Sequence, residues 1–138
     1  MLLMKLKNKE KFAFLELAYY MAYIDGEFEI SEKEVIEEYC VEMGIDNYIY
    51  NQDDLKLENI LKQFISEESQ KIILLELSIL IHSDDKYHKF EQSLLEKIAH
   101  TFNVDIIQLQ IYSQWGKMVS SLYAQGKLFL SNKSSKDN

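Results

Sequence analysis

Proline and arginine are absent from this chain of 138 residues, while glycine occurs four times and cysteine once. The scarcity of proline and glycine excludes collagen, proline-rich linkers and most β architectures, because those depend on dense turns. A lone cysteine, Cys40, cannot form an internal disulfide, so a reducing compartment suits the chain and we expect it to be cytoplasmic. Cys40 falls on the apolar side of an expected helix, and we interpret it as core packing instead of a catalytic thiol.

Residues that favour helices make up much of the composition. The chain is 47% hydrophobic and 28% charged, which is an ordinary globular balance, and Leu, Glu and Lys are strong helix formers. Its length suits one domain. The sequence therefore predicts an all-α fold, a compact bundle of two pseudo-repeated helical hairpins plus a closing helix. The domain is expected over residues 1–126, and residues 127–138 are expected to be a frayed polar tail.

The charge of the chain is strongly one-sided. Its formal net charge is −8, with 23 acids against 15 bases, and every base is lysine. This balance disfavours nucleic-acid binding, which needs a basic surface. Residues 25–42 carry eight acids and one base, Lys33. Such a run is typical of a solvated helix face, but it also suits a cation or a basic protein partner, and the sequence leaves these interpretations open.

No segment is long and apolar enough to predict membrane contact. The longest apolar stretches, Phe12–Ile24 and Ile72–Ile81, are shorter than the roughly 20 residues that cross a bilayer. The first residues carry early lysines and no long apolar core, unlike a signal peptide. Because both apolar stretches are hydrophobic almost all round, we expect two central buried helices.

Capping residues and periodicity divide the chain into six expected helices. Gly44 and Gly126 are expected to end helices, whereas Ser31, paired with Glu34 in a capping box, is expected to begin one. Asp53 or Asp54 is expected to cap the third helix, and Asp105 the last. The expected ranges are 8–24, 31–43, 55–64, 67–83, 90–102 and 106–126.

An internal repeat appears when the chain is shifted by 59 residues. Asp25 then falls on Asp84 and Glu32 on Glu91, so each copy has an Asp and a Glu seven residues apart. Both copies read as an apolar helix, an acidic turn and a second helix that opens with Glu. The copies differ where Gly26 is replaced by Asp85.

The segment from Ala22 to Glu34, with its Asp-Gly turn before a capped helix, resembles the motif of the TerB-like domains, the family of tellurite-resistance TerB. The second copy, with Asp84 and Glu91, resembles the weaker second motif of such domains. The resemblance spans roughly residues 12–104. It implies an all-helical domain linked to stress or tellurite phenotypes and suspected of metal binding, and Asp85 puts the equivalence of the two motifs in question.

The acidic turns are the candidate metal site. Carboxylates of Asp25, Glu32, Asp84 and Glu91 could meet across short turns, and clustered oxygens suit Ca²⁺ or Mg²⁺. The helix dipole also explains an acid in the first turn of a helix without any metal. A secondary group, His82, Asp85 and His88, offers donors for a transition ion but matches no standard zinc spacing.

The sequence contains no glycine-rich phosphate loop, and no serine has a recognisable base beside it. We therefore expect a cytoplasmic, non-enzymatic TerB-like module that binds a divalent cation or a basic protein partner. The alternative is a metal-dependent enzyme that uses Asp25, Glu32, Asp84 and Glu91 as ligands.

Overall fold

A computed structural model describes residues 1–24, 30–82 and 89–132 of the chain. These residues form six α-helices and two 3-10 turns and contain no β-strand, which confirms the all-α fold. In chain order the elements are η1 (Leu3–Lys5), α1 (Asn8–Tyr23), α2 (Ile30–Met43), η2 (Gln52–Asp54), α3 (Leu57–Leu61), α4 (Glu67–Ile81), α5 (Lys89–Thr101) and α6 (Ile106–Asn132).

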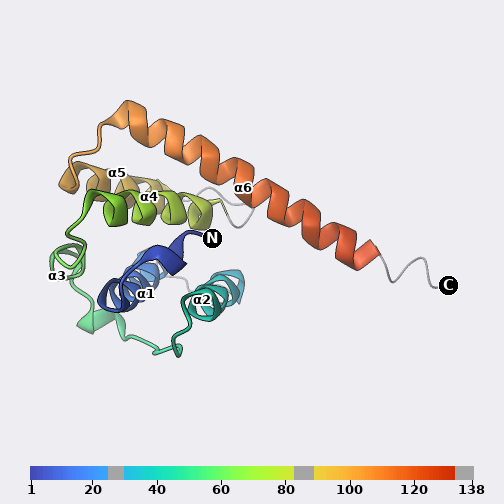
Figure 1. The fold of residues 1–138 in the computed structure, drawn as a ribbon, viewed down its shortest axis with the longest axis horizontal. Helices are drawn as coiled ribbons and strands as arrows, with labels where there is room; N and C mark the ends of the chain where they lie inside the picture. Colours follow the sequence, from blue (N-terminus) through green and yellow to red (C-terminus); the bar gives the residue numbers. More distant parts are fainter. Residues whose placement is uncertain (25–29, 83–88, 133–138) are drawn as a thin grey trace.

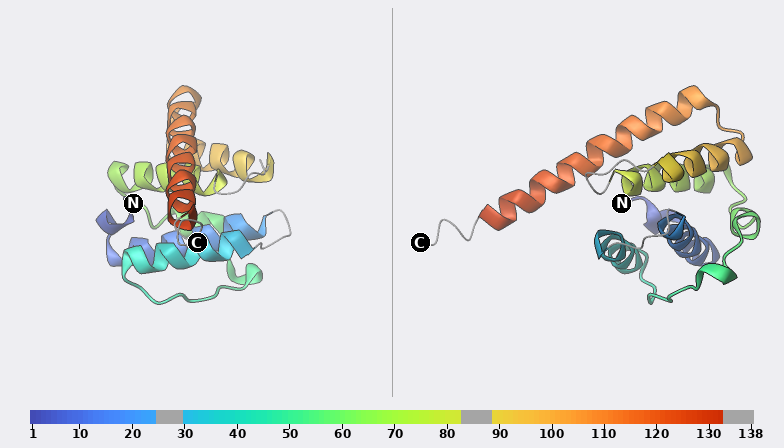
Figure 2. Two further views of the ribbon diagram at one scale, coloured as in Figure 1. Left: turned by 90° about the vertical axis from the view of Figure 1, so that its right-hand side faces the viewer. Right: turned by 180° about the vertical axis from the view of Figure 1, so that it is seen from behind.

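The helices are stacked in layers. Figure 1 shows α6 lying across α4 and α5, while α1, α2 and α3 lie on the other side of α4. The far half of α6 projects beyond the remaining helices, as the view from behind in Figure 2 also shows. In Figure 1, α4 lies between α6 on one side and α1 and α2 on the other, and the carboxyl end of α6 extends past α2.

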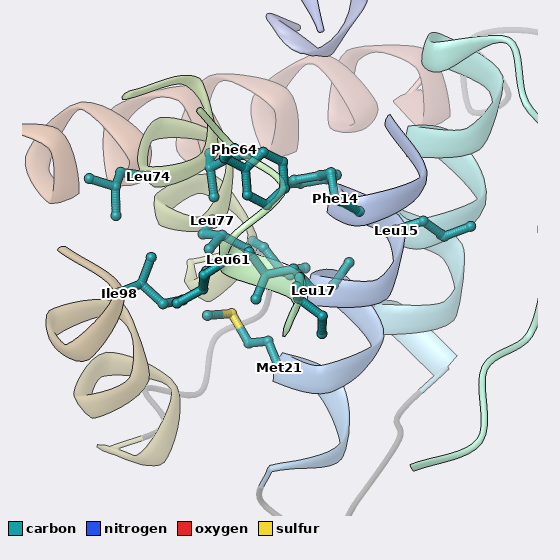
Figure 3. Close-up of a cluster of buried hydrophobic side chains, with 14 of the residues drawn as sticks. Phe14, Leu15, Leu17, Met21, Leu61, Phe64, Leu74, Leu77 and Ile98 are labelled. Carbon is teal, nitrogen blue, oxygen red and sulfur yellow. The ribbon is translucent and has the colours of Figure 1, made fainter. Parts of the chain in front are cut away.

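Both apolar stretches form central helices, as expected. Phe14, Leu17 and Met21 point from α1 toward Leu61, Phe64 and Leu77, whereas Leu15 points toward α2 (Figure 3). Because α1 is covered on several sides, it needs apolar side chains almost all round. Helix α4 is similarly enclosed, between α1, α5 and α6. All the side chains labelled in Figure 3 are fully or almost fully buried.

Close contact fixes the crossing of α6 over α4. A β-carbon added to Gly116 would lie 2.6 Å from the main-chain carbon and the β-carbon of Ser78. Only glycine permits this approach, and the side chain of Ser78 is itself fully buried. Val119 and Leu109 are buried on the same side of α6.

Several expected helix ends agree with the structure. Gly44 has a φ of 68° after α2, and Asn103 has a φ of 60° after α5, so a left-handed residue ends each helix. The Asp105 carboxylate accepts a hydrogen bond from the Gln108 main-chain nitrogen at 2.8 Å, as a helix cap does. Helix α2 already includes Ile30, one residue before the expected cap, Ser31, whose side chain lies outside the described part.

Two expected helix boundaries are wrong. The third helix spans only Leu57–Leu61, because Leu55 and Lys56 are extended, and Asp53 and Asp54 lie in η2 instead of capping it. The last helix does not end at Gly126 but continues to Asn132. Gly44 is the one glycine with positive φ among the described residues, so Gly126 keeps a helical backbone and interrupts nothing.

The 59-residue offset agrees with the element bounds. Shifting α1 and α2 by 59 gives 67–82 and 89–102, against Glu67–Ile81 for α4 and Lys89–Thr101 for α5. The two hairpins therefore share their spacing along the chain. A structural pseudo-symmetry between them stays a prediction.

Candidate functional site

The predicted acidic turns fall largely outside the described residues. Asp25, Asp84, Asp85 and His88 lie in the segments that the structure does not describe. Glu32 and Glu91 lie in the first turns of α2 and α5, and both are buried. Within residues 1–24, 30–82 and 89–132, no three His, Cys, Asp or Glu side chains gather as a metal site would require. The metal site at the acidic turns stays a prediction.

His82 joins α4 to α6. Its Nε2 atom lies 3.4 Å from the Ser113 hydroxyl, and its main-chain carbonyl accepts a hydrogen bond from the Ser120 hydroxyl at 2.5 Å. Partial burial, with a smaller contribution from Lys117, lowers the pKa of His82 below its ordinary value of 6.5. These contacts give His82 a structural role at the end of α4, where it is the terminal cap residue.

Cys40 belongs to the core, as the sequence predicts. Its side chain is buried in α2, and burial, followed by the nearby charge of Glu37, raises the pKa of its thiol. A thiol nucleophile needs the opposite shift and an accessible sulfur. Cys40 is therefore packing and not a reactive group.

A groove lies between α2, α4 and the far half of α6, and we call it the α2–α6 groove. Its volume is about 390 Å³. The side chains that line it come from three helices and from the start of the chain: Met1, Val35, Glu38, Tyr39, Glu42, Glu76, Ile79, Ser120, Tyr123, Ala124 and Lys127. Apolar walls thus alternate with three carboxylates, and among these residues Lys127 carries the one cationic side chain.

Two of these carboxylates hold the first residues of the chain. The Glu76 Oε1 atom accepts a hydrogen bond from the Leu2 main-chain nitrogen at 2.6 Å, and Glu42 Oε2 accepts one from that of Leu3 at 2.9 Å. The ammonium group of Met1 contacts both carboxylates, at 3.2 Å from Glu76. An ammonium beside an apolar side chain therefore already lies against this acidic pair.

Tyr39 shows the electrostatic character of the groove. The phenol is buried, and its hydroxyl donates to the Glu76 main-chain carbonyl at 3.4 Å. Burial raises the pKa of Tyr39 well above its ordinary value, and the charges of Glu76, Glu42 and Glu38 add to this shift. Three carboxylates thus act on one buried phenol.

Sequence reasoning found only part of this groove. The acidic run identified the exposed face of α2, which carries Glu34, Glu37, Glu38 and Glu42 around Val41. It did not predict that Glu76, inside an apolar stretch, would meet the first residues of the chain, or that Leu3 and Leu6 would be buried. The one indication in the sequence was that Glu76 is a charged residue within an otherwise apolar helix. A buried charge needs a partner, so a partner for Glu76 could have been expected.

Comparison of the chain with protein-family models, curated proteins and solved structures found no significant match. Among the described residues, no helix combines the length and the hydrophobicity needed to cross a membrane.

Proposed function

We propose that this chain is a non-enzymatic protein-binding module whose α2–α6 groove takes an amphipathic helical segment bearing a basic residue. The observation that carries the proposal is the pairing of apolar walls with three carboxylates in one cavity of about 390 Å³. Helix-in-groove recognition uses such a surface, with apolar side chains as anchors and charge as a guide to register.

The composition of the groove favours a lysine or arginine in the bound segment. Glu38 reaches the groove from α2, and the Met1 ammonium lies against Glu42 and Glu76. A basic side chain of the partner could bind Glu38 as the Met1 ammonium binds Glu42 and Glu76. The partner's apolar residues would then cover Val35, Ile79 and Tyr123. The net charge of −8 also speeds the encounter with a basic partner.

The wider setting of the proposal comes from the sequence resemblance. A cytoplasmic TerB-like module of a stress or tellurite response is the setting that the motif around Asp25 and Glu32 implies. Two observations support a binding role over catalysis: the Cys40 thiol is buried with a raised pKa, and His82 is held by contacts with α6.

Fluorescence anisotropy with a labelled amphipathic peptide of leucine and lysine tests the proposal. We expect this peptide to bind, a matched peptide with glutamate in place of lysine not to bind, and Glu38→Lys to weaken binding at least tenfold. Glu58→Lys, which makes the same charge change at an exposed position of α3, is the control and should leave binding unchanged. Equal affinity of the two variants, or no binding by the lysine peptide, contradicts the proposal.

A second candidate function is binding of a divalent cation such as Ca²⁺ or Mg²⁺ at the acidic turns. It is favoured by Glu32 and Glu91, which are 59 residues apart and are both buried in the first turn of a helix. Calorimetric titration with Ca²⁺, Mg²⁺, Mn²⁺ and Zn²⁺ should show binding that Asp25→Asn or Asp84→Asn weakens. A metal-dependent enzyme remains the alternative, and it would lose turnover of a substrate when the metal is removed.

A further inference from the structure

Helix α6 has an apolar stripe that faces away from the rest of the molecule. Five large side chains form it, each between 63% and 73% exposed: Ile107, Ile111, Met118, Leu122 and Phe129. At 100° per residue they fall within one narrow sector of the helix, whereas buried Leu109, Gly116 and Val119 fall on the side toward α4. We call this set the outer stripe.

The spacing of the outer stripe keeps it straight. Ile107, Met118 and Phe129 are eleven residues apart, as are Ile111 and Leu122. Eleven residues are close to three whole turns of an α-helix, so the stripe drifts little around the axis. It runs for about 33 Å at 1.5 Å per residue. A second straight helix could therefore follow it along its whole length.

From this geometry we infer that the outer stripe pairs with the same stripe of a second copy of the chain, antiparallel about Met118. With Met118 on the two-fold axis, Ile107 of each copy lies beside Phe129 of the other, and Leu122 lies beside Gln114. Ile107, Met118 and Phe129 of one copy thus meet stripe residues of the other, and Ile111 meets Gln125, so the contact uses the same surface of both copies as an isologous contact requires.

The area agrees with a weak, reversible dimer. Five side chains of this size expose on the order of 500 Å² per copy, near the upper end for apolar patches on monomers. Two copies would bury on the order of 1,000 Å² through the stripe alone, which is the lower limit for a specific interface. Leu128 and Leu130, which are 61% and 76% exposed on the projecting end, lie outside the stripe, one on each side of it.

Charge favours a second copy over a lipid surface. An amphipathic helix that binds anionic lipid places lysines along its apolar stripe. Here the polar residues nearest the stripe are Gln114 and Gln125, while Lys117 and Lys127 lie about 80° and about 140° around the helix from its nearest side chain. The net charge of −8 also repels an anionic bilayer. Uncharged flanks, by contrast, allow two identical stripes to meet.

The dimer would leave the α2–α6 groove open. The groove is lined by Ser120, Tyr123, Ala124 and Lys127, which face a different side of α6 from the outer stripe. Leu122 of the stripe adjoins the groove, since it shares a smaller hollow with Met1, Tyr123 and Lys127, but the remaining stripe residues do not line the groove.

Sedimentation velocity over a range of protein concentrations tests the pairing. We expect a monomer–dimer equilibrium that strengthens with added salt, because two copies of charge −8 repel each other less when screened. Met118→Glu should raise the dissociation constant at least tenfold, with an unchanged circular dichroism spectrum, since Met118 is 63% exposed. Gln110→Glu adds the same charge to an exposed position off the stripe and should leave the equilibrium unchanged.

A crosslink tests the register. Met118→Cys should give a disulfide-linked dimer on mild oxidation and Gln110→Cys should not, while the native Cys40 is buried. A wild-type chain that stays monomeric, a dimer that survives Met118→Glu, or no crosslink through residue 118 overturns the inference. Flotation of the monomer with phosphatidylglycerol vesicles, lost in Met118→Glu, would overturn it in favour of a lipid surface.

Discussion

Gly116 is the single residue on which the crossing of α6 over α4 most depends. Glycine inside a helix is about 1 kcal/mol less favourable than alanine, so its presence needs a reason. That reason is Ser78, whose main-chain carbon would lie 2.6 Å from an added β-carbon. We expect Gly116→Ala to lower the free energy of unfolding by about 1–3 kcal/mol, because a backbone contact must move. Urea denaturation measures the change.

Gly126 provides the matched control for this prediction. It lies in the same helix, and an added β-carbon would meet no atom within 4 Å. Gly126→Ala should therefore raise the free energy of unfolding by up to about 1 kcal/mol, from helix propensity alone. If both substitutions raised stability, α6 would not approach α4 as closely as the structure shows.

His82 gives the fold a dependence on pH. Its pKa is lowered in the folded state, mainly by burial, so the folded chain favours the neutral ring. Above its ordinary pKa of 6.5 the ring is neutral in both states and folding incurs no protonation penalty. As pH falls through this value toward the lowered folded pKa, the unfolded state binds the proton first and stability is lost. Comparing melting temperatures of wild type and His82→Gln across this range should show a steeper acid loss for wild type; parallel curves would contradict the assignment.

The residues next to a position in the sequence predicted the structural role of some of these residues but not of others. Asp105 as a cap and Cys40 as core follow from short-range pattern, and both are confirmed. The two glycines of α6 could not be distinguished, because glycine ends a helix only where the backbone turns left-handed. The sequence around Gly126 does not show that its φ is helical, nor does the sequence around Gly116 reveal Ser78 beside it.

Helix α6 is the element whose length was most underestimated. Its last residues include Leu128, Phe129 and Leu130, all more than 60% exposed. Since these side chains contribute little to the core, we expect deletion of residues 127–138 to leave the melting temperature of dilute protein nearly unchanged. Thermal denaturation followed by circular dichroism measures this, and a fall of many degrees would show that the end of α6 docks. The same deletion removes Phe129 from the outer stripe and should weaken dimerisation.

The long helices were predictable because their patterns are strong. Apolar residues almost all round α1 and α4 indicate enclosure on several sides, and the structure provides it. The short α3 was overestimated, since Leu55 is apolar and periodic with the helix but is buried from an extended backbone. Periodicity alone does not distinguish these two ways of burying one side chain.

The assembly of the helices depends on contacts between residues far apart in the sequence. The groove joins α2, α4 and α6, and its acidic pair, Glu42 and Glu76, also binds the first residues of the chain. The sequence predicted the acidic face of α2 because its charges are consecutive. It could not predict the partner of Glu76, because hydrogen bonds across 74 residues leave no local pattern.

Glu76 should therefore stabilise the molecule as a whole and not only α4. It is 1% exposed and accepts from the Leu2 nitrogen, while Glu42 accepts from that of Leu3, so one short segment links α4 to α2. Glu76→Gln removes the charge and can turn an amide donor toward the Leu2 N–H. We expect it to lower the free energy of unfolding by about 1.5–3 kcal/mol, as for other hydrogen bonds to charged groups.

Guanidinium unfolding of Glu76→Gln, Glu42→Gln and the double variant measures this link. Because both carboxylates hold the same segment, the losses of unfolding free energy in the two single variants should not add. Once one carboxylate no longer binds the segment, removing the other should cost less. Glu38→Gln removes the same charge from the groove wall and serves as the control, with a change of no more than about 0.5 kcal/mol. Strictly additive losses would mean that the two carboxylates act separately, and an unchanged Glu76→Gln would mean that the first residues do not join the two layers.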